Sequence, residues 1–140
     1  MSLSLADRPN ALNWPALMAV VGRLGIGALF LDSGFEKLLA PAATLQYIEA
    51  SGLPFPWLAL VTAIAVEIGG SLALLAGWKV RWIAITLAMF TVAAAIGFHA
   101  NFAEPGQSVH FLKNLAIAGG LVHVAIAGGG QYSLDSRRGK

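Results

Sequence analysis

Cysteine is absent from this 140-residue chain, and charged residues make up only 11% of it. Without thiols the chain cannot form a disulfide scaffold, a thiolate metal site or the dithiol centre of a membrane oxidoreductase. Soluble domains carry about 25% charged residues, so the scarcity of charge argues against a soluble fold. Disorder is excluded as well, because disordered chains combine high charge with low hydrophobicity.

The sequence motifs of several common protein classes are also missing. The chain contains no dinucleotide fingerprint, phosphate-binding loop, nucleophile elbow or zinc-binding helix motif. Its formal net charge is only +2. We therefore expect no nucleic-acid partner, and we read the basic residues first as markers of membrane topology.

Hydrophobic residues are abundant, at 57% of the chain, and the mean hydropathy is +0.72. A small soluble domain could not hide so much apolar surface. We therefore predict an all-α integral membrane four-helix bundle in the lipid bilayer, with the whole chain, 1–140, forming one transmembrane domain. The predicted spans lie at about 15–39, 57–78, 82–100 and 111–128.

The connections between these spans set the orientation. A short amphipathic helix at 42–50 is expected at the interface in the first outer loop, and 129–140 is expected as a cytoplasmic tail. The opposite loops hold only Lys37 and Lys113. Because basic residues favour the cytoplasm, we predict a multi-pass protein of the bacterial inner (plasma) membrane with both termini cytoplasmic. The basic residues on the side of the termini are Arg8, Lys79, Arg81, Arg137, Arg138 and Lys140.

Three ionisable residues fall near the middle of the predicted spans: Arg23, Glu67 and His123. Charges within spans are costly and often functional. We predict that Arg23 pairs with Glu67 beside His123, in a pocket that could bind a quinone head group or relay protons. The alternative is a structural pair that only fixes the register of the helices, and both roles can coexist.

The first span has one polar and small-residue face that we expect to point into the bundle. Its members recur at steps of three and four residues, so they lie on one side of a helix. Small residues on such a face let a second helix approach closely. These residues are Arg23, Gly27, Phe30, Gly34 and Lys37.

A second polar cluster is predicted near the outer ends of the spans. Lys37 ends the first span, His99 ends the third, and Lys113 and Asn114 open the fourth. The cluster is either a substrate or partner site, or a set of snorkelling lysines around a solvated histidine. The histidines lie at unequal depths, so we expect no haem, and we predict no metal site.

The chain resembles the DoxX family of small bacterial membrane proteins from about residue 17 to 136. The resemblance rests on the order and spacing of short motifs along the chain. These motifs are RLG at 23–25, FLDSGFEKL at 30–38, GLPFP at 52–56, EIGG at 67–70, LLAG at 74–77, KNLA at 113–116 and GGGQYSLD at 128–135, together with Tyr47, Arg81 and His99.

The resemblance implies a four-helix membrane bundle and a link with quinol oxidation or redox responses. It also implies that six positions of this chain match the polar motif of the family. These positions are Arg23, Lys37, Glu67, His99, Lys113 and Asn114.

Together these observations predict a component of a quinone-linked oxidoreductase system. Arg23 and Lys37 would hold an anionic or carbonyl oxygen, whereas Glu67 and His99 would accept or relay protons. The predicted ligand-binding set is Arg23, Glu67, Lys113, Asn114 and His123. No redox centre of its own is evident, so electron transfer would need a bound quinone, another cofactor or a partner oxidoreductase subunit. The alternatives are a non-catalytic scaffold for a partner enzyme and a small-molecule binding or carrier protein. Glycine-rich faces would also suit self-association.

Overall fold

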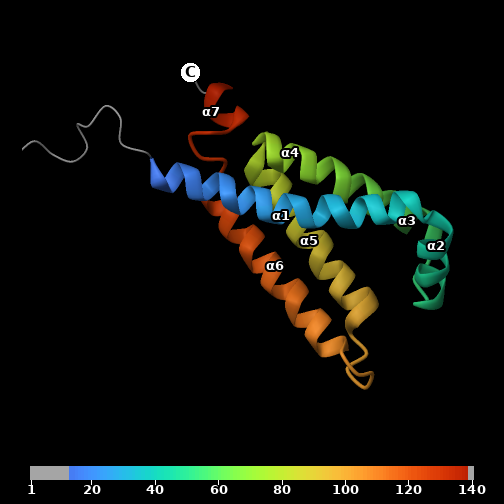
Figure 1. Ribbon diagram of the computed structural model, residues 1–140. Helices are drawn as coiled ribbons and strands as arrows, with labels where there is room; N and C mark the ends of the chain where they lie inside the picture. Colours follow the sequence, from blue (N-terminus) through green and yellow to red (C-terminus); the bar gives the residue numbers. More distant parts are fainter. Residues whose placement is uncertain (1–12, 139–140) are drawn as a thin grey trace, which may run out of the picture.

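The structure is a computed structural model that describes residues 13–138, and the described chain forms helices joined by short connections (Figure 1). Four stretches are long and apolar enough to cross a membrane, which confirms the predicted all-α membrane bundle. Three of them are single helices: α1 (Trp14–Leu39), α5 (Val80–His99) and α6 (Gln107–Ala127). The fourth is a continuous span made of α3 (Pro56–Ile64), η2 (Ala65–Gly69) and α4 (Gly70–Ala76). Two shorter helices are α2 (Pro41–Ala50) and α7 (Leu134–Arg138).

Local chemistry at the helix ends explains several of these boundaries. The side chain of Asn13 accepts a hydrogen bond from the backbone N–H of Ala16 at 3.2 Å, and Pro15 occupies the first turn of α1. The helix α6 begins at Gln107, earlier than the predicted 111, because Gly106 turns the chain directly into it. Gly106 has φ 87°, a left-handed conformation that glycine adopts at little cost.

The long helices form two antiparallel pairs that diverge. α1 packs along α4 and η2, and α5 packs mainly against α6. Figure 1 shows the α5–α6 pair crossing α1 at an angle, so the pairs meet near the chain termini and separate toward the other end. We call these the terminal end and the distal end. The separation leaves space between the pairs at the distal end.

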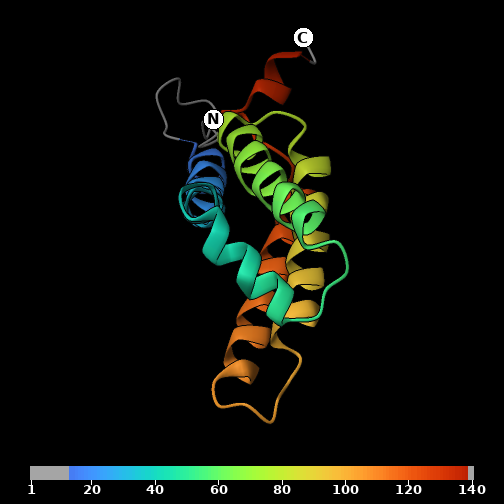
Figure 2. The same ribbon diagram turned by 90° about the vertical axis from the view of Figure 1, so that its right-hand side faces the viewer.

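The helix α2 bridges this space. Figure 2 shows α2 slanting from the distal end of α1 toward α5. Tyr47 of α2 stacks on Phe98 of α5, with ring centroids 5.3 Å apart and planes 17° apart. Ile48, on the same helix, is buried. α2 therefore closes the open side of the bundle by packing against α5.

The apolar core fills the region where the two pairs meet. The predicted inward face of α1 is confirmed, since Arg23, Gly27, Phe30 and Gly34 are all buried. The largest core side chains come from α1, α4, α5 and α6, so every long helix contributes. The core consists of Phe30, Leu74, Val80, Ala84, Leu87, Ala88, Ala118 and Leu121.

The segment after α6, expected as a polar tail, folds back over the terminal end. Ser133 is buried, and its hydroxyl donates to the carbonyl oxygen of Gly130 at 2.7 Å. Asp135 accepts hydrogen bonds from the first backbone N–H groups at the start of α5, from Lys79 at 2.7 Å and from Val80 at 2.8 Å. The segment therefore caps a membrane helix in addition to carrying basic charge.

Candidate binding cavity

A cavity of about 530 Å³ occupies the distal half of the bundle, between the two helix pairs and beneath α2. Most of its wall is apolar, and its polar groups come from α1, α2, α3, η2, α5 and α6. The lining residues on which the argument below depends are Ser33, Lys37, Tyr47, Phe55, Glu67, Phe90, Ala94, Phe98, His99 and Asn114.

An ion pair between Lys37 and Glu67 forms the polar part of this cavity. The Nζ of Lys37 lies 3.1 Å from Oε1 and 3.0 Å from Oε2 of Glu67. It also donates to the hydroxyl and the carbonyl oxygen of Ser33, at 2.8 Å and 3.2 Å. Ser33 in turn donates to Oε1 of Glu67 at 3.2 Å. All three ammonium protons of Lys37 thus have acceptors.

The two carboxylate oxygens of Glu67 differ in their hydrogen bonds. Glu67 is only 5% exposed, and its Oε2 accepts no hydrogen bond from residues 13–138 despite its closeness to the Lys37 ammonium. Buried carboxylate oxygens normally accept hydrogen bonds, because a buried acceptor without a donor is costly. The nearest donor group is the Lys37 ammonium at 3.0 Å, whose protons have the other acceptors named above.

The backbone around Glu67 is a π-helical turn. The element η2 interrupts an otherwise α-helical span between α3 and α4. The hydroxyl of Ser71 donates to the carbonyl oxygen of Glu67, which is one of the backbone acceptors of this turn. Such single turns are rare in proteins and are frequent at functional sites, because the extra residue re-aims a side chain. Here the turn contains the acidic member of the ion pair.

Close contact between α1 and η2 brings the pair together. A methyl group placed on Gly34 would lie 2.6 Å from Cγ1 of Ile68 and 3.1 Å from Cβ of Glu67. No larger residue fits without moving one helix. The glycine therefore sets the separation of the two backbones, and Lys37 follows one turn later on the same face.

Aromatic rings form much of the apolar wall. Tyr47 and Phe98 stack at one side, and Phe55 and Phe90 complete the ring-lined part. Ligand cavities in proteins commonly combine such apolar walls with a few fixed polar groups, at volumes of about 300–1,000 Å³. The cavity suits a flat, mostly apolar molecule that carries one or two polar oxygens.

Histidine and amide groups lie at the distal rim. The Nδ1 of His99 lies 2.8 Å from Oε1 of Gln107, which leaves its Nε2 free of this contact. The ring of His99 stacks on that of His110, with centroids 5.1 Å apart. Asn114 also lines the cavity. Residues 13–138 hold no group of three or more His, Asp or Glu side chains that could bind a metal ion.

The predicted pair between Arg23 and Glu67 is wrong. Arg23 is buried at the terminal end, where its Nη2 donates to the carbonyl oxygen of Tyr132 at 2.7 Å. Its Nη1 has no hydrogen-bond partner within the described residues and packs against Gly77. The helix α1 rises about 16 Å between Arg23 and Gly34, the residue that faces Glu67. Lys37 therefore occupies the position that we predicted for Arg23.

Two other predicted site residues lie outside the cavity. His123 is on an exposed face of α6, away from both Arg23 and Glu67. Lys113 is exposed as well, and its Nζ lies 3.5 Å from Nδ1 of His110. The structure brings Lys37, Glu67, His99 and Asn114 to one cavity. Glu67 was predicted in the cluster near the middle of the spans, and the other three were predicted in the cluster near their outer ends.

Several cavity residues were not predicted. Ser33 precedes Lys37 by one helical turn, and that spacing is the signal that could have identified it. The stacked pair of Tyr47 and Phe98 and the partner of His99, Gln107, had no comparable signal. Their contacts depend on where α2 and the connection before α6 place them.

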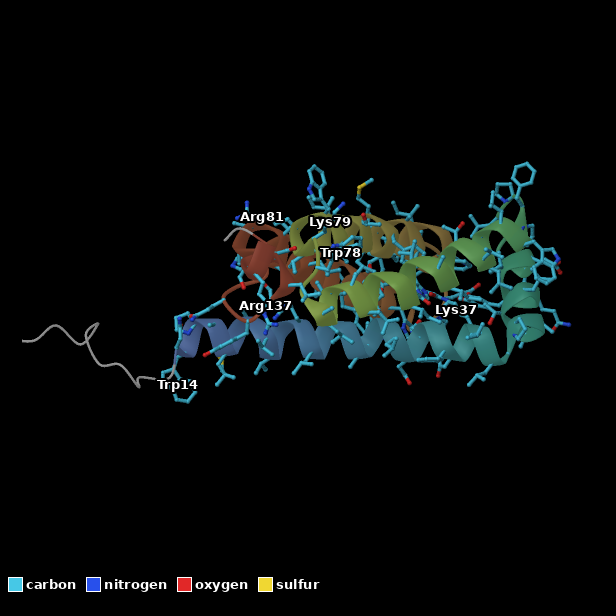
Figure 3. The ribbon with its side chains drawn as sticks, turned by 90° about the horizontal axis from the view of Figure 1, so that it is seen from above. Trp14, Lys37, Trp78, Lys79, Arg81 and Arg137 are labelled. Carbon is cyan, nitrogen blue, oxygen red and sulfur yellow. The ribbon has the colours of Figure 1, made fainter. Side chains whose placement is uncertain are left out.

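The two ends of the molecule also differ in surface composition. Figure 3 shows the labelled Lys37 toward the distal end, apart from the other labelled residues. Those gathered toward the terminal end are Trp14, Trp78, Lys79, Arg81 and Arg137. Tryptophan and basic residues are typical of the boundary between lipid and water.

Comparison with known proteins identifies the family of the chain. A sequence profile of the family described as DoxX matches residues 18–100, more than half of the chain. The chain belongs to the DoxX family. The matched region covers most of α1 and all of α2 to α5, and it includes Lys37, Glu67 and His99.

Curated relatives of this DoxX protein cover most of its length. It is 45% identical over 116 residues to inner membrane protein YqjF of Escherichia coli strain K12, which covers 83% of this chain and 88% of the relative. It is 29% identical over 126 residues to inner membrane protein YphA of the same organism, which covers 86% and 90%. No solved structure matches the chain. The DoxX protein is thus a multi-pass protein of the inner membrane.

Proposed function

We propose that this DoxX protein binds the head group of a membrane quinone or quinol in the distal cavity, as a component of a quinone-linked oxidoreductase system. The observation that carries the proposal is the Lys37–Glu67 ion pair, which lies in the wall of a ring-lined cavity. A hydroxyl group of a quinol can donate a hydrogen bond to a carboxylate. Quinones also dissolve in the lipid that surrounds the bundle.

The residues of the cavity fit such a head group. Aromatic side chains supply flat apolar walls, and the volume of about 530 Å³ is within the usual range for ligand cavities. Lys37 cannot donate a further proton without releasing a present acceptor, so its contribution is the positive charge beside Glu67. The amide of Asn114 and the Nε2 of His99 can face a carbonyl oxygen from the rim.

Each polar residue then has a defined role. A bound quinone would supply two-electron chemistry coupled to two protons. Glu67 accepts a hydrogen bond, and the adjacent Lys37 stabilises its carboxylate. His99 exchanges protons between the cavity and the distal surface through the ring nitrogen that does not contact Gln107. Electrons would leave or arrive through a partner oxidoreductase subunit.

The orientation in the membrane forms part of the same proposal. Basic residues and tryptophans gather toward the terminal end in Figure 3. By the positive-inside rule this end faces the cytoplasm, with both termini. The cavity then lies in the outer half of the inner membrane, and His99 faces the outer side.

The first test measures bound quinone directly. The protein is purified in nanodiscs made from inner-membrane lipid, and the quinone is extracted and quantified per protein. We expect near-stoichiometric quinone in the native protein and a loss of several-fold in Glu67→Gln. The control is Glu36→Gln, which removes a carboxylate from the distal half of α1. Glu36 is exposed and does not line the cavity. No quinone in the native protein, or equal loss in both variants, contradicts the proposal.

A second variant tests the cavity without altering a charge. Ala94→Phe adds a ring to the α5 wall and should displace the ligand. Ala116→Phe adds the same ring to an exposed position of α6 and should leave the quinone content unchanged. Retention of quinone in Ala94→Phe would show that the ligand binds elsewhere. A stable partner protein with no extractable quinone would instead favour the scaffold function.

A further inference from the structure

A second hollow, which we call the terminal groove, lies at the opposite end of the bundle from the cavity. It measures about 510 Å³ and is formed by the start of α5 and by the glycine-rich connection between α6 and α7. The proposed quinone site uses none of its residues. Those on which the following argument depends are Lys79, Arg81, Gly128, Gly129 and Asp135.

Arg81 presents its guanidinium group to the groove. The side chain lies against Gly128, where an added methyl group would be 3.3 Å from Nε and 3.7 Å from Nη2. No hydrogen bond or ion pair within residues 13–138 engages this guanidinium. Its planar set of donors matches the oxygens of a phosphate, which arginine commonly binds through two parallel hydrogen bonds.

The glycine-rich connection brings the backbone close to the same place. Gly128 has φ 77°, a left-handed conformation in which other residues are strained. Gly129 is buried against Ser133 and Val80, where an added methyl group would be within 3.0 Å of both side chains. The backbone N–H of Gly129 donates no hydrogen bond within the described residues. Buried N–H groups normally have an acceptor, so this one would suit an anion.

The one carboxylate of the groove offsets only part of its basic charge. Both oxygens of Asp135 accept backbone hydrogen bonds from Lys79 and Val80, so the carboxylate serves as the cap of α5. The Lys79 ammonium lies 5.1 Å from the centroid of the Trp78 ring and forms no ion pair within the described residues. The side chains of Lys79 and Arg81 therefore provide two cations without acidic partners.

The position of the groove identifies the source of the anion. Trp82 lines it. Trp14 and Trp78 lie toward the same end (Figure 3), as expected where a bilayer meets water. Lipid phosphates lie at this depth, and basic pockets between membrane helices bind acidic head groups. We propose that the terminal groove binds the phosphate of an anionic phospholipid such as phosphatidylglycerol, through Arg81, Lys79 and the backbone of Gly129.

Native mass spectrometry can count the lipids that the protein retains after release from nanodiscs. Nanodiscs that contain equal amounts of phosphatidylglycerol and phosphatidylcholine provide the probe. We expect the native protein to retain phosphatidylglycerol selectively. Because each basic residue near a membrane surface contributes about 1 kcal/mol, Arg81→Gln should lower this retention about fivefold. Lys79→Asn should act in the same direction, and asparagine tolerates the left-handed backbone at this position.

The matched control removes a charge from the same end but outside the groove. Arg137→Gln does this, because Arg137 is exposed on α7 and does not line the groove. Equal losses in Arg137→Gln and Arg81→Gln, at unchanged melting temperatures, would show a general surface-charge effect and overturn the site. Arg81→Lys should restore part of the selectivity. Complete displacement of the lipid by millimolar inorganic phosphate would overturn the lipid source, as would equal retention of both lipids.

Discussion

The two ends of the bundle each bury a charged side chain, but they accommodate it in different ways. At the distal end, Glu67 is paired with Lys37 in the wall of a cavity. At the terminal end, Arg23 donates to the backbone of Tyr132 in a closed region packed with Gly77 and Ser133. A buried charge alone therefore does not identify a site.

What separates the two is the packing around the charge. Near Arg23 all long helices converge, and the segment after α6 fills the remaining space, so the guanidinium joins that segment to α1. Near Glu67 the helix pairs diverge and α2 closes the gap without filling it (Figures 1 and 2). We therefore expect changes at Arg23 to alter stability without altering quinone binding, and changes at the Lys37–Glu67 pair to alter both stability and quinone binding.

The largest expected effect comes from breaking the Lys37–Glu67 pair. Lys37→Met leaves Glu67 buried without its counter-ion, which should lower the free energy of unfolding by about 3 kcal/mol, the lower end of the range for buried pairs. We choose the lowest value of that range because the side chain of Lys37 is 24% exposed. Chemical denaturation in detergent micelles measures the effect.

The double variant makes this prediction specific. Lys37→Met combined with Glu67→Gln removes both charges, so it should be more stable than Lys37→Met alone. Lys113→Met is the control, since Lys113 is exposed near the same end. If the two single losses simply add in the double variant, the two side chains are not energetically coupled and the pair is not the organising feature of the distal end.

The next largest effect is predicted for Arg23→Met at the terminal end. The change leaves the carbonyl oxygen of Tyr132 without its charged donor and should destabilise the protein by about 2 kcal/mol. Quinone bound per folded molecule should stay at the native level, because Arg23 is remote from the cavity. Arg137→Met, at an exposed position, should leave the stability unchanged. Loss of quinone in a folded Arg23→Met protein would contradict the separation of the two ends.

The features that depend on one helix at a time could be predicted from the sequence. Helical spacing identified the face of α1 that contains Arg23, Gly27, Phe30 and Gly34, and all four are buried. A helix has a fixed period, so residues on one face are determined by counting along the chain. The hydrophobic spans were predicted from apolar runs long enough to cross a bilayer, which is also a property of one segment at a time.

Pairing between helices could not be obtained in this way. We placed Arg23 and Glu67 at similar depth by counting residues from the ends of their spans. In the structure Gly34 faces Glu67 and Gly27 faces Leu75, so Arg23 lies near Gly77. The relative shift of α1 and α3 depends on the close contact at glycine and on the placement of α2, neither of which follows from periodicity.

The sequence also did not show which face of α6 points inward or where the segment after α6 packs. His123 lies on a face of α6 that no other helix covers, although its depth alone predicted an inward position. Asp135 follows a run of glycines and reads as part of a polar tail. Its role as a cap depends on the return of the chain to the start of α5, which is a long-range contact.

A smaller effect is expected from changing the distance between α1 and η2. Gly34→Ala places a methyl group against Ile68 and Glu67, so it should push the helices apart and cost about 1–2 kcal/mol. Bound quinone should fall as well, because the Lys37–Glu67 pair lengthens. Thermal unfolding and quinone extraction measure the two effects. Gly25→Ala is the control, since nothing lies within 4 Å of the added group. Native quinone content in Gly34→Ala would show that the close contact does not position the site.

The smallest effect is expected at the cap that closes the terminal end. Asp135→Ala removes the acceptor for the backbone N–H groups of Lys79 and Val80, so it should cost about 1 kcal/mol, as for other helix caps. Amide hydrogen exchange should quicken at Lys79 and Val80 and stay unchanged at the start of α6. Asp32→Ala, at an exposed position of α1, is the matched control. Quinone content should not change in either variant, because the cap supports the closed end of the bundle and the cavity lies at the open one. Unchanged exchange at Lys79 and Val80 would show that the segment after α6 merely rests on α5 without capping it.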